Sequence, residues 1–212
     1  ILPLLGIGGM QLFSAEAPVL GGDKLHPRIS DTAKRLWLIY VGLTFLNAML
    51  LYFSGMPLFD SINHAMSTMA SGGFSTKNES IGYWNHMPQI QYITVLFMIL
   101  AGTNFVLLYY IIKGKIRSVF ANTEFRWFIG FIFIFVLIVM ISILRLETYV
   151  FSNTSLFSTV EQSFRHALFQ VVAVITTTGL VTADFTAWTP FVTMVFFGLM
   201  FLGGSTGSTS GG

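Results

Sequence analysis

Two short loops rich in glycine and hydroxyl residues carry the chemistry that this sequence suggests. The first loop reads TMASGGFSTKN over residues 68–78, and the second reads TTTGLVTAD over residues 176–184. Neither loop contains an evident catalytic group, so the functional atoms are the backbone carbonyls that a loop leaves outside helical hydrogen bonding. Carbonyl oxygens can replace the hydration shell of a cation. Both loops are therefore candidate cation sites.

The two loops match one another by position. Aligning Gly73 with Gly179 places a small residue before each glycine, an apolar residue after it, and Thr76 opposite Thr182. Each loop follows a semi-polar helical segment, which itself follows a long apolar segment, and each loop precedes another apolar run. The order span, pore helix, glycine loop, span thus occurs twice, as an internal repeat of roughly a hundred residues.

The segments that position these loops are typical of a membrane protein. Hydrophobic residues make up 54% of the chain and charged residues 9%, against about 25% charged residues in a soluble domain. Residues 36–54, 90–112 and 125–144 are each long and apolar enough to cross a bilayer, which takes roughly 20 helical residues. A fourth run, residues 190–202, is too short to cross alone. A net charge of +2 without a stacking platform gives no indication of a nucleic-acid partner.

The basic residues predict the orientation of the spans. One group precedes the first span and another lies between the second and the third: Lys24, Arg28, Lys34, Arg35, then Lys113, Lys115, Arg117, Arg126. The positive-inside rule places both groups in the cytoplasm. Residues 57–78 must then enter and leave from the outer side, as a re-entrant helix followed by an extended strand. Non-helical backbone at that depth requires burial in protein or a water-filled path.

Together these motifs resemble the Trk/Ktr family of potassium transport proteins. The resemblance rests on LPLLGIGGMQLF, PRISDTAKRLWLIY, SGGFST, the TTTG loop and GGSTGSTSGG, in collinear order along the chain. It implies an all-α transmembrane fold of the K⁺ channel-like superfamily, with four non-identical repeats around one pore. Residues 1–35 would be the end of the first repeat and a cytoplasmic link. Residues 36–113 would be the second repeat, and residues 114–212 most of the third, in a single membrane domain.

The resemblance also assigns a selectivity filter and a gate. The backbone ligands of K⁺ would be Ser71, Gly72, Gly73 and Phe74 in one repeat, and Thr177, Thr178, Gly179 and Leu180 in the next. Glycine suits such a loop because it adopts positive φ without steric cost. The gate would be the glycine-rich intramembrane loop of Gly203, Gly204, Ser205, Thr206, Gly207, Ser208 and Thr209.

Cargo, partners and location follow from the same resemblance. It implies K⁺ as the transported ion, no organic cofactor, no enzymatic activity, and the cytoplasmic (inner) membrane of a bacterium with several crossings. The implied partners are the lipid bilayer, a second copy in a homodimer and a cytoplasmic nucleotide-binding regulatory subunit, with no nucleic acid. The chain opens without an initiator methionine, so we expect a piece of a longer protein.

Other interpretations stay open at this point. The final GGSTGSTSGG could be a flexible linker, and a chain with two filters could be a non-conducting structural fragment of a transporter. Leu180 stands where a K⁺ channel filter has an aromatic residue, so a Na⁺-permeable or Na⁺-coupled transporter is also an alternative. A membrane enzyme or receptor is a further class, but the expected spans carry no facing pair of catalytic groups.

Polar residues on the two expected pore helices invite separate expectations. We expect His64 and His166 to be packed or hydrogen-bonded, and Asp60 and Glu161 to stabilise the starts of their helices. Arg165 is expected near the outer membrane interface, paired with Glu161 one turn earlier. On that expectation, replacing Arg165 with methionine would leave permeation roughly intact.

Overall fold

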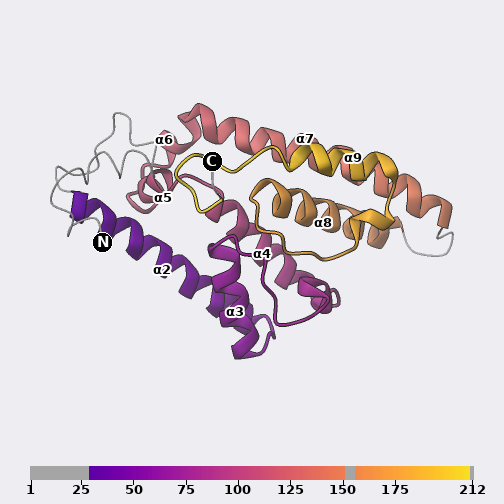
Figure 1. Ribbon diagram of the computed structural model, residues 1–212, viewed down its shortest axis with the longest axis horizontal. Coiled ribbons are helices and arrows are strands. Elements are labelled where there is room, and N and C mark those ends of the chain that lie inside the picture. The colour runs from indigo at the N-terminus through magenta and orange to yellow at the C-terminus, as the bar shows by residue number, and fades with distance from the viewer. Residues whose placement is uncertain (1–28, 151–155, 211–212) are drawn as a thin grey trace.

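Two long helices form the outer part of the fold in the computed structural model, which describes residues 29–150 and 156–210; the regular structure of these ranges is helical (Figure 1). These helices are α2 (Ile29–Phe53) and α7 (Thr123–Val150). Each contains a stretch long and apolar enough to cross a membrane, and only 17% and 28% of these stretches are buried within the protein. Their apolar side chains therefore face outward, as lipid contact requires.

The second expected span is not one helix. Residues 90–112 fall into α4 (Pro88–Ala101) and α5 (Phe105–Ile112), whose axes are bent by 109° at the break. The expectation of a continuous span was wrong, although the two pieces together still pass the length and hydropathy test for one bent span. The side chain of Asn104 accepts a hydrogen bond from the amide of Val106 at 2.8 Å and so caps the start of α5.

Two helices occupy the positions of the expected pore helices. They are α3 (Leu58–Met69) and α8 (Leu156–Ile175). Helix α3 packs on α2, whereas α8 packs on both α7 and α4. Helix α4 therefore joins the two repeats, and the main apolar core lies where α4, α7 and α8 meet, around Met98, Val139 and Phe169.

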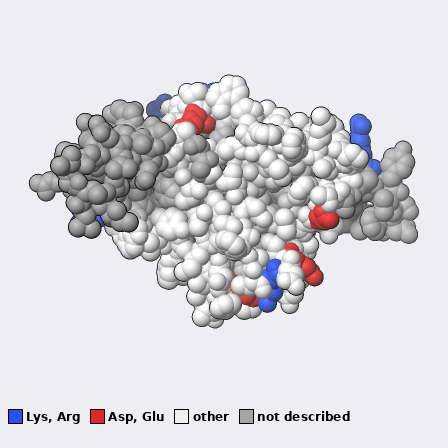
Figure 2. Space-filling view, in the orientation of Figure 1, with Lys and Arg blue, Asp and Glu red and all other residues white. Residues whose placement is uncertain are grey.

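The remaining elements are short. They are η2 (Ser80–Trp84), α6 (Ile116–Ala121), η3 (Phe185–Ala187) and α9 (Pro190–Leu199). With ten residues, α9 is too short to cross a membrane alone. It runs into the non-helical segment 203–210, the yellow trace near α4 and α5 in Figure 1. Figure 2 shows charged side chains in a few small groups on an otherwise uncharged face. The predicted link in residues 1–28 lies outside the described residues.

Candidate functional site

The two glycine loops have the same backbone conformation. Two residues beyond the end of each pore helix the chain turns to positive φ, at Ser71 (51°) and at Thr177 (53°). Two residues later it does so again, at Gly73 (70°) and Gly179 (73°). A left-handed conformation costs a non-glycine residue about 1–2 kcal/mol. Both loops hold the same strained pattern at the positions that the sequence alignment pairs.

The hydrogen bonds that end the two pore helices are equivalent as well. The amide of Gly72 donates to the carbonyl of Ser67 at 2.8 Å, and the amide of Thr178 donates to the carbonyl of Ala173 at 2.9 Å. These bonds bring each loop back over the last turn of its own helix. The repeat seen in the sequence therefore extends to individual backbone hydrogen bonds.

The structure brings the two loops against each other. A Cβ atom built on Gly73 would lie 2.5 Å from the carbonyl oxygen of Thr178, closer than any real carbon–oxygen contact of that kind. The side chains of Thr178 and Leu180 are buried, whereas Phe74 is 80% exposed. The backbone, and not the side chains, thus forms the contact between the loops.

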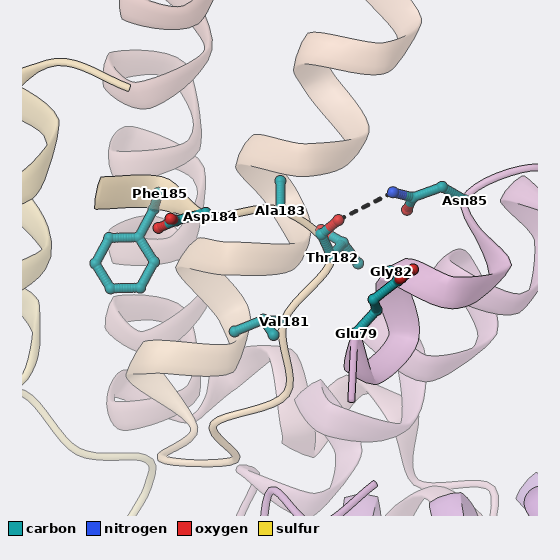
Figure 3. Close-up of a pocket in the computed structure, with 8 residues that line it drawn as sticks. All are labelled: Glu79, Gly82, Asn85, Val181, Thr182, Ala183, Asp184 and Phe185. Atoms are coloured by element: carbon teal, nitrogen blue, oxygen red, sulfur yellow. Dashed lines mark hydrogen bonds between the residues drawn. The ribbon is translucent and has the colours of Figure 1, made fainter. Parts of the chain in front are cut away.

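The second loop is also hydrogen-bonded by the outer segment of the preceding repeat. The amide of Gly82 donates to the carbonyl of Val181 at 3.1 Å, and the amide of Val181 donates to the hydroxyl of Ser80 at 3.2 Å. The Asn85 amide donates to the carbonyl of Thr182 at 3.1 Å, and both residues line an open hollow of about 410 Å³ (Figure 3). Residues 80–85 of one repeat therefore fix the irregular segment that follows the glycine of the other.

Arg165 supports this contact from within the protein. Its guanidinium donates to Glu161 at 2.9 Å and to the side-chain oxygen of Gln91 at 2.7 Å, and the Gln91 amide donates to Asn85. The pairing with Glu161 agrees with the sequence expectation, and Arg165 is only 3% exposed, so its charge is enclosed by protein groups. Glu161 lies in the second turn of α8, so it does not cap the helix as expected.

The polar residues of α3 contact the segment that follows the first loop, residues 74–78, which has no regular secondary structure. The hydroxyl of Thr76 donates to Asp60 at 2.6 Å, and the ammonium of Lys77 lies 3.5 Å from the same carboxylate. His64 is hydrogen-bonded to the hydroxyl of Ser75 at 2.9 Å, the structural role expected for it. Asp60 lies in the first turn of α3, where the helix dipole favours an acid, and it also holds the segment.

The glycine-rich segment 203–210 fills the break between α4 and α5. The amide of Ser205 donates to the carbonyl of Gly102 at 2.9 Å, and the amide of Thr209 donates to the carbonyl of Ala101 at 3.2 Å. These two carbonyls lie at the end of α4, where a helix leaves acceptors without an internal partner. The segment from the third repeat therefore satisfies the broken helix of the second.

Three further contacts hold the same segment. The amide of Phe105 donates to the carbonyl of Gly207 at 3.2 Å. The carboxylate of Glu124, at the start of α7, accepts from the amide of Thr206 at 2.7 Å and from its hydroxyl at 2.8 Å. Beside Glu124, a cavity of about 200 Å³ separates part of the segment from α7.

The segment also contacts both glycine loops. The hydroxyls of Ser71 and Thr209 are 3.3 Å apart, and the hydroxyl of Thr177 donates to the carbonyl of Ser210 at 2.8 Å. Both contacts are made by the residues with positive φ that precede the two loop glycines. The two loops, the helix break and the glycine-rich segment thus form one connected unit.

Comparison with known proteins assigns the chain to a family. A family model described as TrkH, cation transport protein, matches residues 1–212. The chain belongs to the TrkH cation transport family. Its relatives include the Trk system potassium uptake proteins TrkH of Escherichia coli K12, 42% identical, and of Salmonella typhimurium, 41% identical. Each alignment covers the whole chain and 42% of the relative, so the chain spans less than half the length of these TrkH proteins.

A solved structure supports the same assignment. The crystal structure of the potassium transporter TrkH from Vibrio parahaemolyticus matches with a TM-score of 0.81 at 37% sequence identity. The match covers 95% of this chain and 42% of that one. The TrkH family and the relatives named here are transport proteins and not enzymes, and the fold is all-α.

Several residues that support the site in this TrkH-family chain have no signal of their own in the sequence. Ser80 begins η2, Asn85 follows it and Gln91 lies on α4; their residue types and spacing form no motif, and only their contacts reveal a role. Thr76 and Thr182 did have a signal, because the alignment of the two loops pairs them.

Proposed function

We propose that the protein containing this chain transports K⁺ across the cytoplasmic membrane of a bacterium through a channel-like pore. The observation that carries the proposal is the pair of loops with matching positive φ, packed backbone against backbone. Backbone carbonyls in fixed loops are the ligands that K⁺ filters use. The names of the relatives, Trk system potassium uptake proteins, point to the same cargo.

In this proposal the two loops are parts of one selectivity filter. The carbonyls that would hold K⁺ are those of Ser71, Gly72, Gly73, Phe74, Thr177, Thr178, Gly179 and Leu180. Two loops do not enclose an ion, so the remaining filter loops would come from other parts of the longer protein. The chain on its own would then be non-conducting, and every functional test uses the full-length parent.

Location and partners are proposed with the function. The protein would lie in the inner membrane, with residues 113–126 on the cytoplasmic side, because Lys113, Lys115 and Arg117 are exposed there. A basic cytoplasmic surface is a reasonable contact for a nucleotide-binding regulatory subunit. A homodimer is proposed from the resemblance alone.

The first test measures transport and ion selectivity. We expect the full-length parent, expressed in bacteria that lack their own K⁺ uptake systems, to give saturable ⁸⁶Rb⁺ uptake. External K⁺ should compete at least about tenfold more strongly than Na⁺, a difference of about 1.4 kcal/mol in binding. Equal competition would favour the Na⁺-permeable alternative, which the buried Leu180 in place of an aromatic residue leaves open. Absence of uptake by membrane-inserted protein would contradict the proposal.

We further propose that the glycine-rich segment is the gate. It contains Gly203, Gly204, Ser205, Thr206, Gly207, Ser208 and Thr209. Its contacts with both loops, next to Ser71 and Thr177, support a position below the filter on the path of the ion. The cavity of about 200 Å³ beside Glu124 offers space into which the segment can move.

The helix break explains how such a gate could open at little cost. In a continuous helix the carbonyl of Ala101 would accept from the amide of Phe105, and the carbonyl of Gly102 from the amide of Val106. In the bent form both carbonyls accept instead from the glycine-rich segment, and Phe105 donates to Gly207. If the segment leaves, α4 and α5 can pair these groups themselves. The exchange keeps the carbonyls of Ala101 and Gly102 hydrogen-bonded in both forms.

A cross-link tests the gate directly. Replacing Ser71 and Thr209 with cysteine places two thiols where hydroxyls are 3.3 Å apart, within reach of a disulfide after small adjustment. We expect oxidation of this double variant to lower ⁸⁶Rb⁺ uptake at least about fivefold, and reductant to restore it, because the bond fixes the closed position of a two-state element. This chain contains no cysteine, so a cysteine-free parent treated with the same oxidant is the control. Full uptake by cross-linked protein would contradict the gate.

A further inference from the structure

Equivalent positions on the two pore helices contact equivalent threonines beyond the loops. With Gly73 aligned to Gly179, position 60 corresponds to 166 and Thr76 corresponds to Thr182. Thr76 donates its hydroxyl to Asp60 at 2.6 Å, and the ring of His166 is hydrogen-bonded to the Thr182 hydroxyl at 3.0 Å. The helix residues differ in type, yet the threonine, its position and its contact are the same.

The next turn of each of these helices makes a second contact with the segment after the loop, although Ser75 and Ala183 are not positions that the alignment pairs. One turn after Asp60, His64 is hydrogen-bonded to the hydroxyl of Ser75 at 2.9 Å. One turn after His166, the side-chain amide of Gln170 donates to the carbonyl of Ala183 at 2.8 Å. Each segment after a loop glycine, residues 75–76 and 182–183, is therefore held by two consecutive turns of the preceding helix.

Each of these contacts has one buried partner, whereas Thr76, Ser75, His166 and Ala183 are half-buried. Asp60 is 5% exposed, Thr182 3%, Gln170 1% and His64 fully buried. A buried polar group that loses its partner cannot replace it with solvent, so such bonds resist distortion of the segment. The segment that leaves the loop is thereby fixed within three residues of Gly73 and Gly179.

We propose that Thr76 and Thr182 are positioning residues for ion discrimination, held by Asp60 and His166. The two hydroxyls fix the segment after each loop glycine and so prevent the proposed filter carbonyls, those of residues 71–74 and 177–180, from closing around the smaller Na⁺. The inference rests on the proposed transport function and adds to it the residues that set K⁺ over Na⁺ selectivity. Both repeats have a hydrogen bond between the helix and the threonine, although the helix residue differs. We attribute this to the need to fix the segment after the loop glycine, which either helix residue can do.

The test compares valine and serine at the two threonines in the full-length parent. Thr76→Val and Thr182→Val remove the hydroxyl at nearly constant volume, and Thr76→Ser and Thr182→Ser keep it. The readout is the ratio of the inhibition constants of Na⁺ and K⁺ against ⁸⁶Rb⁺ uptake, with the amount of protein in the membrane measured in parallel. We expect each valine variant to lower this ratio at least about fivefold and each serine variant to stay within about twofold of wild type.

A matched control and a double variant complete the experiment. Thr44→Val removes a half-buried hydroxyl that bonds only within α2, and it should leave the ratio unchanged. Asp60→Leu should lower the ratio at least as much as Thr76→Val does, because it removes the same hydrogen bond and also the ion pair with Lys77; adding Thr76→Val to Asp60→Leu should lower the ratio no further. If a valine variant does not reach the membrane, Asp60→Leu supplies the measurement from the other partner.

The outcomes separate this inference from the function on which it rests. Valine variants that lower the amount of protein without changing the ratio would overturn the inference and leave a structural role for the threonines. Serine variants that lose selectivity as strongly as valine would overturn it as well. A wild-type parent without ⁸⁶Rb⁺ uptake would instead overturn the proposed transport function.

Discussion

Replacing Gly73 with alanine in the full-length parent is expected to abolish ⁸⁶Rb⁺ uptake, with a loss of at least about a hundredfold, or about 2.7 kcal/mol. Gly73 has a φ of 70°, and its Cβ would lie 2.5 Å from the carbonyl oxygen of Thr178. That oxygen belongs to the backbone of the other loop, so it cannot move aside like the end of a flexible side chain. The two loops would have to separate, and the ligand geometry would be lost.

The same substitution at Gly179 should be milder. Its φ is 73°, but the nearest atom to an added Cβ, Gly73 Cα, is 3.9 Å away, so alanine there adds strain without a clash. A left-handed alanine costs about 1–2 kcal/mol, which corresponds to roughly a tenfold loss. Aspartate at either position adds a carboxylate against carbonyl oxygens and should abolish uptake.

A glycine in open space provides the control for both alanine variants. Gly130, on α7, has no neighbouring atom within 4 Å of an added Cβ, and alanine favours a helix. Gly130→Ala should therefore keep wild-type uptake. Equal uptake by Gly73→Ala and Gly130→Ala, at equal amounts in the membrane, would show that the contact between the loops is not needed for transport. Uptake that is insensitive to aspartate at Gly73 and Gly179 would contradict the filter itself.

Replacing Arg165 with methionine is expected to destabilise the protein and to lower uptake, the reverse of the expectation from sequence. Methionine fills much of the volume of arginine but leaves the buried oxygen of Gln91 without a donor and ends the pairing with Glu161. Losing a charged hydrogen-bond donor in a buried network costs on the order of 3 kcal/mol. Gln91 also orients Asn85, whose amide donates to the carbonyl of Thr182. Without these bonds the backbone of the second loop should no longer be held in one conformation.

Thermal unfolding in detergent and ⁸⁶Rb⁺ uptake measure the two consequences. Arg145→Met is the matched control, because Arg145 is exposed on α7 and should tolerate the change. A second variant, Arg165→Met with Gln91→Leu, removes the unpaired oxygen of Gln91 but also its bond to Asn85, so it should recover stability only in part and should not restore uptake. An Arg165→Met protein as stable and as active as Arg145→Met would refute the role given to this network.

Local properties of the sequence were sufficient to predict that this is a membrane protein and where its two glycine loops lie. A deficit of charge and long apolar runs indicate a membrane protein, because lipid accepts no other surface. Family membership and an all-α fold agree with that interpretation. The pairing of Gly73 with Gly179 was also visible, since positive φ favours glycine whatever the surrounding fold. The use of these loops as a filter stays a proposal.

Contacts between distant segments decided the rest. Residues 90–112 have the mean hydropathy of one span, and that average does not reveal the break after Ala101, where the carbonyls of Ala101 and Gly102 accept from Thr209 and Ser205 of the other repeat. Local sequence predicted the pairing of Arg165 with Glu161, but its second partner, Gln91, lies on another helix and was found only in the tertiary structure. The sequence alone determined the membrane class and the paired loop glycines, because these depend on each residue and its near neighbours. The tertiary structure decided where buried donors and acceptors find their partners, because that pairing depends on the whole fold.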